Sequence, residues 1–110
     1  MSDLATRVCQ PCSGETSALD ERQIKDLLAD VHGWKVTEGY IERTFRFDNY
    51  HQTIAFVNAV AWIANKDWHH PLMDVGYRDC TVKYWTHAID GLSENDFICA
   101  AKINALVDKI

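Results

Sequence analysis

The spacing of apolar and polar residues predicts a first helix that follows Asp20. Asp20 can cap this helix, and Gln23 would complete a capping box three residues later. Leu19 and Ile24 lie at the spacing of a hydrophobic staple. The pattern ends at Gly33, a residue type typical of the left-handed position that follows a helix. The apolar stripe of the helix consists of Ile24, Leu27, Leu28 and Val31.

Alternating apolar residues predict two hairpins. The first joins residues 34–37 to residues 40–47. The second joins residues 72–77 to residues 80–87 through a two-residue turn, Arg78-Asp79. A turn this short makes the two strands antiparallel, so the start of one meets the end of the other.

A long helix is expected between the hairpins. It begins at Asp48 or Asn49 and continues to about Lys66. Its apolar stripe is broad, which indicates a helix that lies flat on a sheet. We expect the stripe to comprise Ile54, Val57, Ala61 and Ala64, with Phe56, Val60 and Ile63 beside them.

The last helix has a clear start signal. Ser93 is at the cap, Asp96 is at the third helical position, and Leu92 with Phe97 forms a staple. Its stripe consists of Cys99, Ile103, Leu106 and Ile110. The element order is therefore α-ββ-α-ββ-α. This order predicts an α+β fold, with a four-stranded antiparallel sheet and helices packed on one face.

The chain is expected to form one domain preceded by an arm. Residues 1–18 are polar, contain Pro11 and Gly14, and show no sustained period, so we predict a flexible N-terminal arm. Residues 19–110 form the single predicted domain. The 110-residue chain is 47% hydrophobic, which is enough apolar material for one core.

Charge and apolar run length exclude several classes of function. The formal net charge is −5, from 16 acidic and 11 basic residues, which argues against a nucleic-acid-binding surface. No apolar run approaches the roughly 20 residues that span a bilayer. The first 12 residues lack the apolar stretch of a secretory signal, so we expect a cytoplasmic protein without membrane contact.

Four cysteines allow two interpretations. In the expected cytoplasmic setting, all four thiols should be reduced. The CxxC spacing of Cys9 and Cys12 would suit zinc or redox chemistry, but no further close ligand pair and no βαβ context accompany it. We therefore treat this pair as incidental to the arm. Cys80 and Cys99 lie in periodic segments and are expected to act as small apolar residues.

Three histidines are the strongest candidates for chemistry. Pro71 favours extended backbone at His70, so the side chains of His69 and His70 should point to opposite sides. The short turn of the second hairpin should bring His87 close to His70. Such a cluster could bind zinc, or it could serve as an acid and base pair near neutral pH. The histidines could equally be satisfied surface groups.

Aromatic residues near the histidines also allow two interpretations. They could form flat walls for a planar substrate, or they could belong to the core. These residues are Trp34, Trp68, Tyr77 and Trp85.

The intervals between these residues resemble the signature of the pterin-4a-carbinolamine dehydratases. His69-His70-Pro71 is followed, after five residues, by Tyr77. His87 then follows after nine residues, and Asp96 after eight more. The run from Gly91 to Phe97, the Gly33-Trp34 pair and Phe45-Arg46-Phe47 are also similar to that family. The resemblance covers the chain from about residue 19 to residue 110.

The resemblance implies dehydration of 4a-hydroxytetrahydrobiopterin to quinonoid dihydropterin and water, without a metal or redox cofactor. This reaction regenerates the cofactor of the aromatic amino acid hydroxylases. The resemblance assigns acid and base work to His69 and His87, and substrate binding to His70, Pro71, Trp34 and Trp85. Asp96 and Ser93 would have supporting or capping roles. The implied partners are a pterin substrate, a homodimer or homotetramer, and an aromatic amino acid hydroxylase.

One alternative function and one departure accompany this resemblance. Members of the family are also similar to non-catalytic dimerisation modules for transcription factors, so an assembly role is the second hypothesis. The family often has an acidic residue four positions before the first histidine, where this chain has Asn65. Asp67 is acidic but displaced by two positions. An amide cannot form a charged pair with an imidazolium, so His69 would lack that electrostatic partner.

Overall fold

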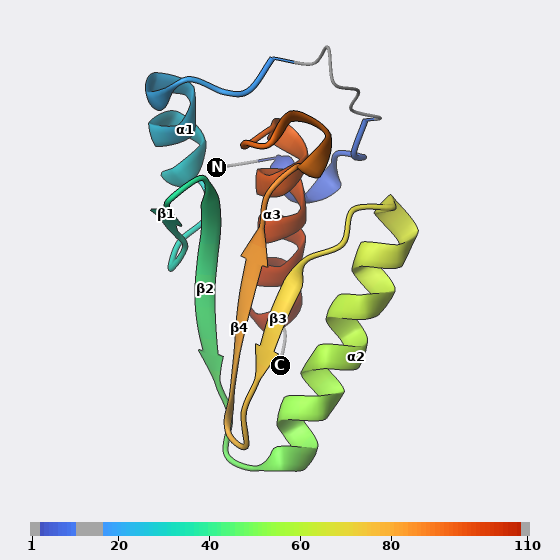
Figure 1. Cartoon of the computed structure of the whole chain (residues 1–110). Helices are drawn as coiled ribbons and strands as arrows, with labels where there is room; N and C mark the ends of the chain where they lie inside the picture. The colour runs from blue at the N-terminus through green and yellow to red at the C-terminus, as the bar shows by residue number, and fades with distance from the viewer. Residues whose placement is uncertain (1–2, 11–16, 109–110) are drawn as a thin grey trace.

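Four strands form one antiparallel sheet in the order β1-β2-β4-β3 (Figure 1). The computed structural model describes residues 3–10 and 17–108. The strands are β1 (Lys35–Thr37), β2 (Tyr40–Arg46), β3 (Leu72–Val75) and β4 (Asp79–Tyr84). The helices are α1 (Glu21–Leu28), α2 (Tyr50–Asp67) and α3 (Glu94–Asp108), with short 3-10 turns η1 (Leu4–Thr6) and η2 (His87–Ile89). The predicted α+β fold is therefore confirmed.

Local sequence signals account for the start of the first helix and for the turn that leads into the first hairpin. Asp20 accepts a hydrogen bond from the Gln23 backbone, and the Gln23 side chain accepts one from the Asp20 backbone, so the predicted capping box is present. Helix α1 ends at Leu28, short of the predicted end at Gly33, so Val31 lies beyond the helix, although it is buried as expected. Gly33 has a φ of +84°, in the turn before β1. Only glycine adopts this left-handed conformation without strain.

The second hairpin differs from its prediction by one residue at the turn. The Gly76 N–H donates to the Asp79 carbonyl at 2.8 Å, so the turn residues are Tyr77 and Arg78. Asp79 is recruited into β4 instead, where it is paired with Arg46 of β2. Strand β4 also ends at Tyr84, three residues before its predicted end.

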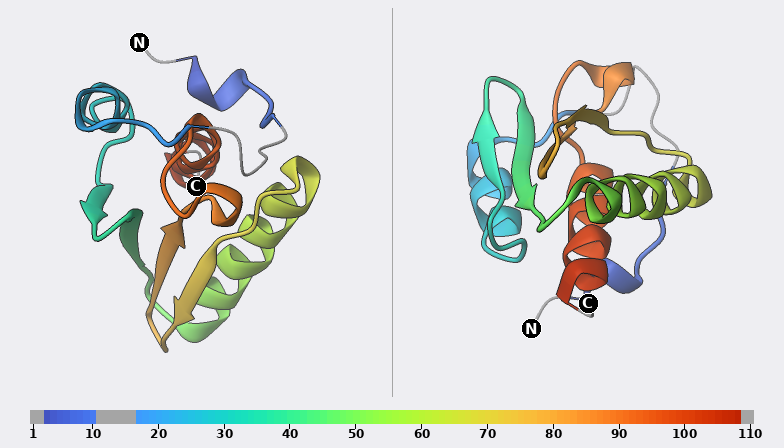
Figure 2. Two further views of the ribbon diagram at one scale, coloured as in Figure 1. Left: turned by 45° about the horizontal axis from the view of Figure 1, so that its top comes forward. Right: turned by 90° about the horizontal axis from the view of Figure 1, so that it is seen from below.

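Helices α2 and α3 lie on the same side of the sheet, and α1 packs beside α3 (Figure 2). The buried face of α2 differs from the expected stripe, because Ala61 is exposed. The helix is oriented so that Phe56 faces the sheet, where its ring centroid lies 4.7 Å from that of Phe45 and 5.1 Å from that of Phe47. The residues that α2 buries are Thr53, Phe56, Val60 and Ala64.

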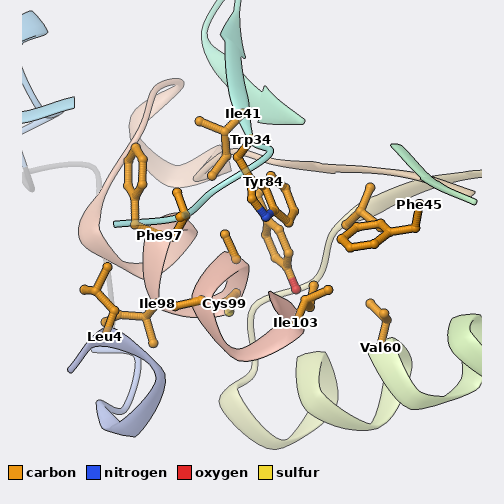
Figure 3. Close-up of a cluster of buried hydrophobic side chains, with 14 of the residues drawn as sticks. Leu4, Trp34, Ile41, Phe45, Val60, Tyr84, Phe97, Ile98, Cys99 and Ile103 are labelled. Atoms are coloured by element: carbon orange, nitrogen blue, oxygen red, sulfur yellow. The ribbon is translucent and has the colours of Figure 1, made fainter. Parts of the chain in front are cut away.

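The core fills the space between the sheet and α3. Figure 3 shows side chains from β2, β4, α2 and α3 meeting there, together with Leu4 from the N-terminal segment. Of the expected stripe on α3, Cys99 and Ile103 are buried and Leu106 is partly buried. Ile110 lies outside the described residues.

The structure differs from the expected flexible arm over residues 3–10. Leu4 is only 2% exposed and belongs to the core, because η1 packs against α3. Two hydrogen bonds join Gln10 to Asn95, and Arg7 forms an ion pair with Glu94. These contacts attach the segment to the start of α3. The part of the predicted arm that contains Pro11, Cys12 and Gly14 lies outside the described residues, and the division at residue 19 stays a prediction.

Candidate functional site

A pocket of about 640 Å³ lies at the end of the sheet where α2 stops. Its walls come from the end of α2, the loop before β3, η2, the start of α3 and the N-terminal segment (Figure 1). His69, His70 and His87 all line it. His70 and His87 thus belong to one pocket, although not through the predicted strand pairing, because the turn lies at Tyr77-Arg78 and β4 ends before His87.

The end of α2 places three successive residues at the pocket with different exposure. Trp68 has a φ of +55°, a left-handed conformation that stops the helix without a glycine. The backbone N–H of His69 still donates to the Ala64 carbonyl at 3.1 Å, which holds the turn closed. As a result, the Trp68 side chain is 79% exposed, whereas the His69 side chain is 13% exposed. His70 follows in an exposed position and lines the same pocket as His69, so the two side chains differ in exposure but do not serve opposite sides as predicted.

Asp96 holds His69 in place. One carboxylate oxygen of Asp96 lies 2.6 Å from His69 Nε2, and the whole Asp96 residue is 0% exposed. The other oxygen accepts hydrogen bonds from the Thr86 hydroxyl and the Ser93 N–H, both at 2.9 Å. Asp96 therefore caps α3 and positions His69 at the same time. The Ser93 hydroxyl contacts the Thr86 hydroxyl at 2.7 Å, which completes the buried network.

This environment changes the protonation of His69. Burial lowers the pKa of His69, but the hydrogen bond and the charge of Asp96 outweigh burial, so the pKa is raised above the ordinary value of histidine. The Tyr84 ring stacks beneath the imidazole, with 5.3 Å between centroids and 16° between planes. His69 is thus a fixed imidazole that favours its protonated form.

His87 has a contrasting environment at the same pocket. It is the first residue of η2, and its side chain is exposed. The Trp85 ring lies 4.5 Å from the His87 imidazole and supports it from one side.

The expected substrate-binding residues are not all at the pocket. Trp34 does not line this pocket, because its ring is buried in the core at 5% exposure. The indole N–H of Trp34 donates to Asn104 on α3 at 2.9 Å, which explains why the ring faces the interior. Pro71 follows His70 directly, and Trp85 packs on His87, so both flank pocket residues without lining the pocket.

The missing family carboxylate at Asn65 does not leave His69 without a partner. Asn65 is exposed on α2, and Asp67 forms an ion pair with Lys102 of α3. The carboxylate partner of His69 is Asp96 instead, which reaches it from α3. Sequence reasoning identified Asp96 only as a supporting or capping residue, because nothing local joins it to a histidine 27 residues earlier.

Several pocket residues were not expected from the sequence, among them three near the N-terminal segment. Cys9, Gln10 and Asn95 line the wall beside His69. The CxxC spacing was the one signal in the sequence that drew attention to this segment.

Within the described residues 3–10 and 17–108, one group of potential metal ligands lies close together. The ligand atoms of Cys9, Asp67 and Cys99 lie within 4.8 Å of one another, whereas the three histidines form no such group. Asp67 is already paired with Lys102, so a cation there would have to displace the lysine ammonium.

Comparison with known proteins agrees with the fold and the histidine pocket. A family model described as "Pterin 4 alpha carbinolamine dehydratase" matches residues 17–106. The chain belongs to this family. The match extends from just before α1 to near the end of α3 and so includes the whole sheet and all three histidines.

Relatives in this dehydratase family cover almost the entire chain. A Nitrosomonas eutropha protein named "Putative pterin-4-alpha-carbinolamine dehydratase" is 54% identical over 106 residues, which is 96% of this chain and 94% of the relative. A protein of the same name from Legionella pneumophila strain Corby is 51% identical over 109 residues, 96% of each chain. The crystal structure of a "transcriptional coactivator/pterin dehydratase" from Brucella melitensis is 29% identical and superposes with a TM-score of 0.78. That match covers 82% of this chain and 98% of the Brucella chain.

The helices were also compared with the requirements of a membrane span. In the part of the chain that the structure describes, every helix is too short or too polar to cross a bilayer.

Proposed function

We propose that this protein dehydrates 4a-hydroxytetrahydrobiopterin to quinonoid dihydropterin and water. Membership of the dehydratase family supports the reaction class. The observation that carries the proposal is the pocket in which His69, fixed by Asp96, shares the walls with the exposed His87. The pocket volume of about 640 Å³ lies within the range of roughly 300–1,000 Å³ that is typical of small-molecule sites.

The reaction needs two proton transfers. A proton must reach the 4a-hydroxyl as its C–O bond breaks, and a proton must leave N5 as the N5 electron pair forms the new C=N bond. We assign the first step to His69, because its raised pKa makes the protonated imidazole more favoured than in an ordinary histidine, as a proton donor requires. Its Nε2 is held by Asp96, so Nδ1 is the ring nitrogen left to donate to the substrate.

We assign the second step to His87. Its exposed imidazole can accept the N5 proton and pass it to water, which leaves His87 ready for the next turnover. The proton lost by His69 is replaced from solvent in the same way, so the cycle balances without a redox cofactor or metal.

The remaining pocket residues would bind and orient the pterin. We assign His70 to orientation, with Pro71 and Trp85 supporting the wall on which the ring lies. The amide side chains of Gln10 and Asn95 add hydrogen-bonding capacity beside His69. In this proposal the reaction regenerates the pterin cofactor of aromatic amino acid hydroxylases, which would be protein partners, and the enzyme acts as a homodimer or homotetramer.

The proposal is tested by replacing His87 with alanine. We expect His87→Ala to lower kcat by roughly 10²–10⁴-fold, the usual contribution of general acid–base catalysis. Turnover is followed by the absorbance of the pterin, with His51→Ala as the matched control. His51 is also an exposed histidine, but it lies at the start of α2 and does not line the pocket. Wild-type turnover in His87→Ala would remove His87 from the mechanism.

The same measurements separate an enzyme from an assembly module. The Brucella relative carries both "transcriptional coactivator" and "pterin dehydratase" in its title. If the wild-type protein binds a reduced pterin but accelerates no dehydration, the dehydratase proposal fails and the non-catalytic role is favoured.

A further inference from the structure

Two thiols meet behind the wall of the pocket. Cys9 Sγ lies 3.5 Å from Cys99 Sγ, although 90 positions separate them in the chain. Cys99 is completely buried on α3, where Figure 3 shows it among the core side chains. Cys9 is partly buried and lines the pocket. One thiol is therefore accessible from the pocket, and the other lies directly behind it.

The segment that carries Cys9 is fixed by contacts on both sides of the thiol. The Gln10 N–H donates to the Asn95 side chain at 2.9 Å, and the Asn95 amide donates to the Gln10 carbonyl at 2.6 Å. Cys9 Sγ itself lies 3.7 Å from the Asn95 carbonyl. Leu4 anchors the other end of the segment in the core. The contact between the thiols thus results from a docked segment.

Nearby charges distinguish the two thiols. The hydrogen bond from Cys99 lowers the pKa of Cys9, and the charges of His69 and Lys102 act in the same direction against burial and Asp67. The same hydrogen bond, together with burial, raises the pKa of Cys99. Cys9 is therefore the better nucleophile, because the thiolate is the reactive form. Cys99 is placed to react in a second step.

We propose that Cys9 and Cys99 are a redox-active thiol pair that forms a reversible disulfide with a hydroperoxide as oxidant. The Cys9 thiolate attacks the terminal peroxide oxygen, the O–O bond breaks, and water or an alcohol leaves after protonation. The resulting sulfenic acid is attacked by Cys99, which forms the S–S bond and releases water. Both thiols together lose two electrons and two protons, and the hydroperoxide is reduced.

The disulfide would fix the N-terminal segment covalently to α3. Closing the gap from 3.5 Å to a bond of about 2 Å needs a shift of about 1.5 Å, which a partly buried loop residue can supply. The bridge closes a loop of roughly 90 residues, and restraint of so long a loop strongly limits the unfolded chain. Oxidation is therefore expected to raise the melting temperature.

A metal site is the competing interpretation of the same thiols. Asp67 is the third ligand-bearing residue beside them, but its carboxylate is engaged by Lys102. This ion pair leaves two sulfur ligands, whereas a structural zinc site usually has four protein ligands. The geometry thus favours the disulfide.

The experiment treats the reduced full-length protein with one equivalent of hydrogen peroxide in the presence of a chelator. Unreduced peptide mapping by mass spectrometry should find a peptide pair linked through Cys9 and Cys99. The melting temperature should rise by on the order of 10 °C and return after dithiothreitol. Because neither readout requires turnover, the inference stands or fails independently of the proposed dehydratase activity.

Variants identify the pairing. Cys9→Ser and Cys99→Ala should each abolish the crosslink and the thermal shift, whereas Cys12→Ser and Cys80→Ala should retain both. Cys80 is a matched buried thiol, because it lies on β4 within the sheet. A Cys9–Cys12 crosslink in the wild-type protein, over-oxidation of Cys9 without any crosslink, or tight stoichiometric zinc that blocks oxidation would each overturn the proposal.

Discussion

Replacing Asp96 with asparagine removes the negative charge that holds His69. The two side chains have nearly the same shape, so the substitution leaves no cavity. The amide keeps one acceptor oxygen, which would accept the hydrogen bonds that the Thr86 hydroxyl and the Ser93 N–H donate. Its NH₂ group must then face His69 Nε2, so the imidazole can remain there only as an acceptor, in the neutral form. We therefore expect Asp96→Asn to lower the pKa of His69.

The cost to stability follows from the bond that is lost. A hydrogen bond between charged groups contributes about 1.5–3 kcal/mol, and a neutral one about 1 kcal/mol. Because His69 is only 13% exposed and Asp96 is 0% exposed, solvent screens this pair little. At acidic pH we expect a loss of about 3 kcal/mol, with the weaker bond to the other oxygen included. This is a large share of the roughly 5–15 kcal/mol that stabilises an ordinary domain.

The loss should depend on pH in one direction. The pKa of His69 is raised in the folded protein, so its contribution to stability is complete below the unfolded histidine pKa of about 6.5. That contribution disappears as the pH rises through the folded pKa of His69. Other groups that face the imidazole, namely Asp67, Cys9 and Tyr84, are identical in both proteins and largely cancel in the comparison. The difference between wild type and variant should therefore shrink as the pH rises through the folded pKa of His69, towards about 1 kcal/mol.

Urea unfolding at pH 5.5 and pH 9, followed by tryptophan fluorescence, measures this difference. Thr86→Val is the control, because it removes a hydrogen bond to Asp96 without changing the charge next to His69. Its cost of about 1–2 kcal/mol should be the same at both pH values. Equal losses for Asp96→Asn at pH 5.5 and pH 9, or an unchanged His69 pKa in an NMR titration, would refute the reasoning.

Three further substitutions test other parts of the structure. Trp34→Phe should lower the free energy of unfolding by about 2–3 kcal/mol and leave KM unchanged, because the Trp34 ring belongs to the core. A raised KM with unchanged stability would show instead that Trp34 contacts the substrate. Gly33→Ala should destabilise the protein by about 1–2 kcal/mol in thermal unfolding, since φ is +84° and the new Cβ would lie 2.7 Å from Arg43 Nε. Asn65→Asp should change kcat less than about threefold, because it adds only an exposed charge near His69, whose buried partner is already in place; a larger gain would show that the usual family position matters here.

Features decided by neighbouring residues were predictable from the sequence. The capping box of α1 and the positive φ of Gly33 depend on groups a few positions apart, and both were anticipated. The shared pocket of His70 and His87 was predictable only in part: the hairpin brings both to one end of the sheet, but its turn lies one residue earlier than predicted and β4 ends before His87.

Features decided by distant packing were not predictable. The predicted stripe on α2 included Ala61, which is exposed, whereas Phe56, expected only beside the stripe, is buried because it packs on Phe45 and Phe47. The buried position of Trp34 depends on its hydrogen bond to Asn104, which is 70 residues away in the sequence. The family resemblance identified the three histidines as candidate site residues. It did not predict the contacts between the N-terminal segment and α3.

Helix α3 comes last in the sequence but completes both the core and the pocket, and this has a consequence during synthesis of the chain. This helix follows all four strands in sequence, yet it supplies the apolar residues that cover the sheet and the carboxylate that fixes His69. While the ribosome is still translating α3, the strands and α2 expose an uncovered apolar face, a state prone to aggregation. A frameshift or premature stop within α3 should therefore produce an insoluble product and not a partly active enzyme.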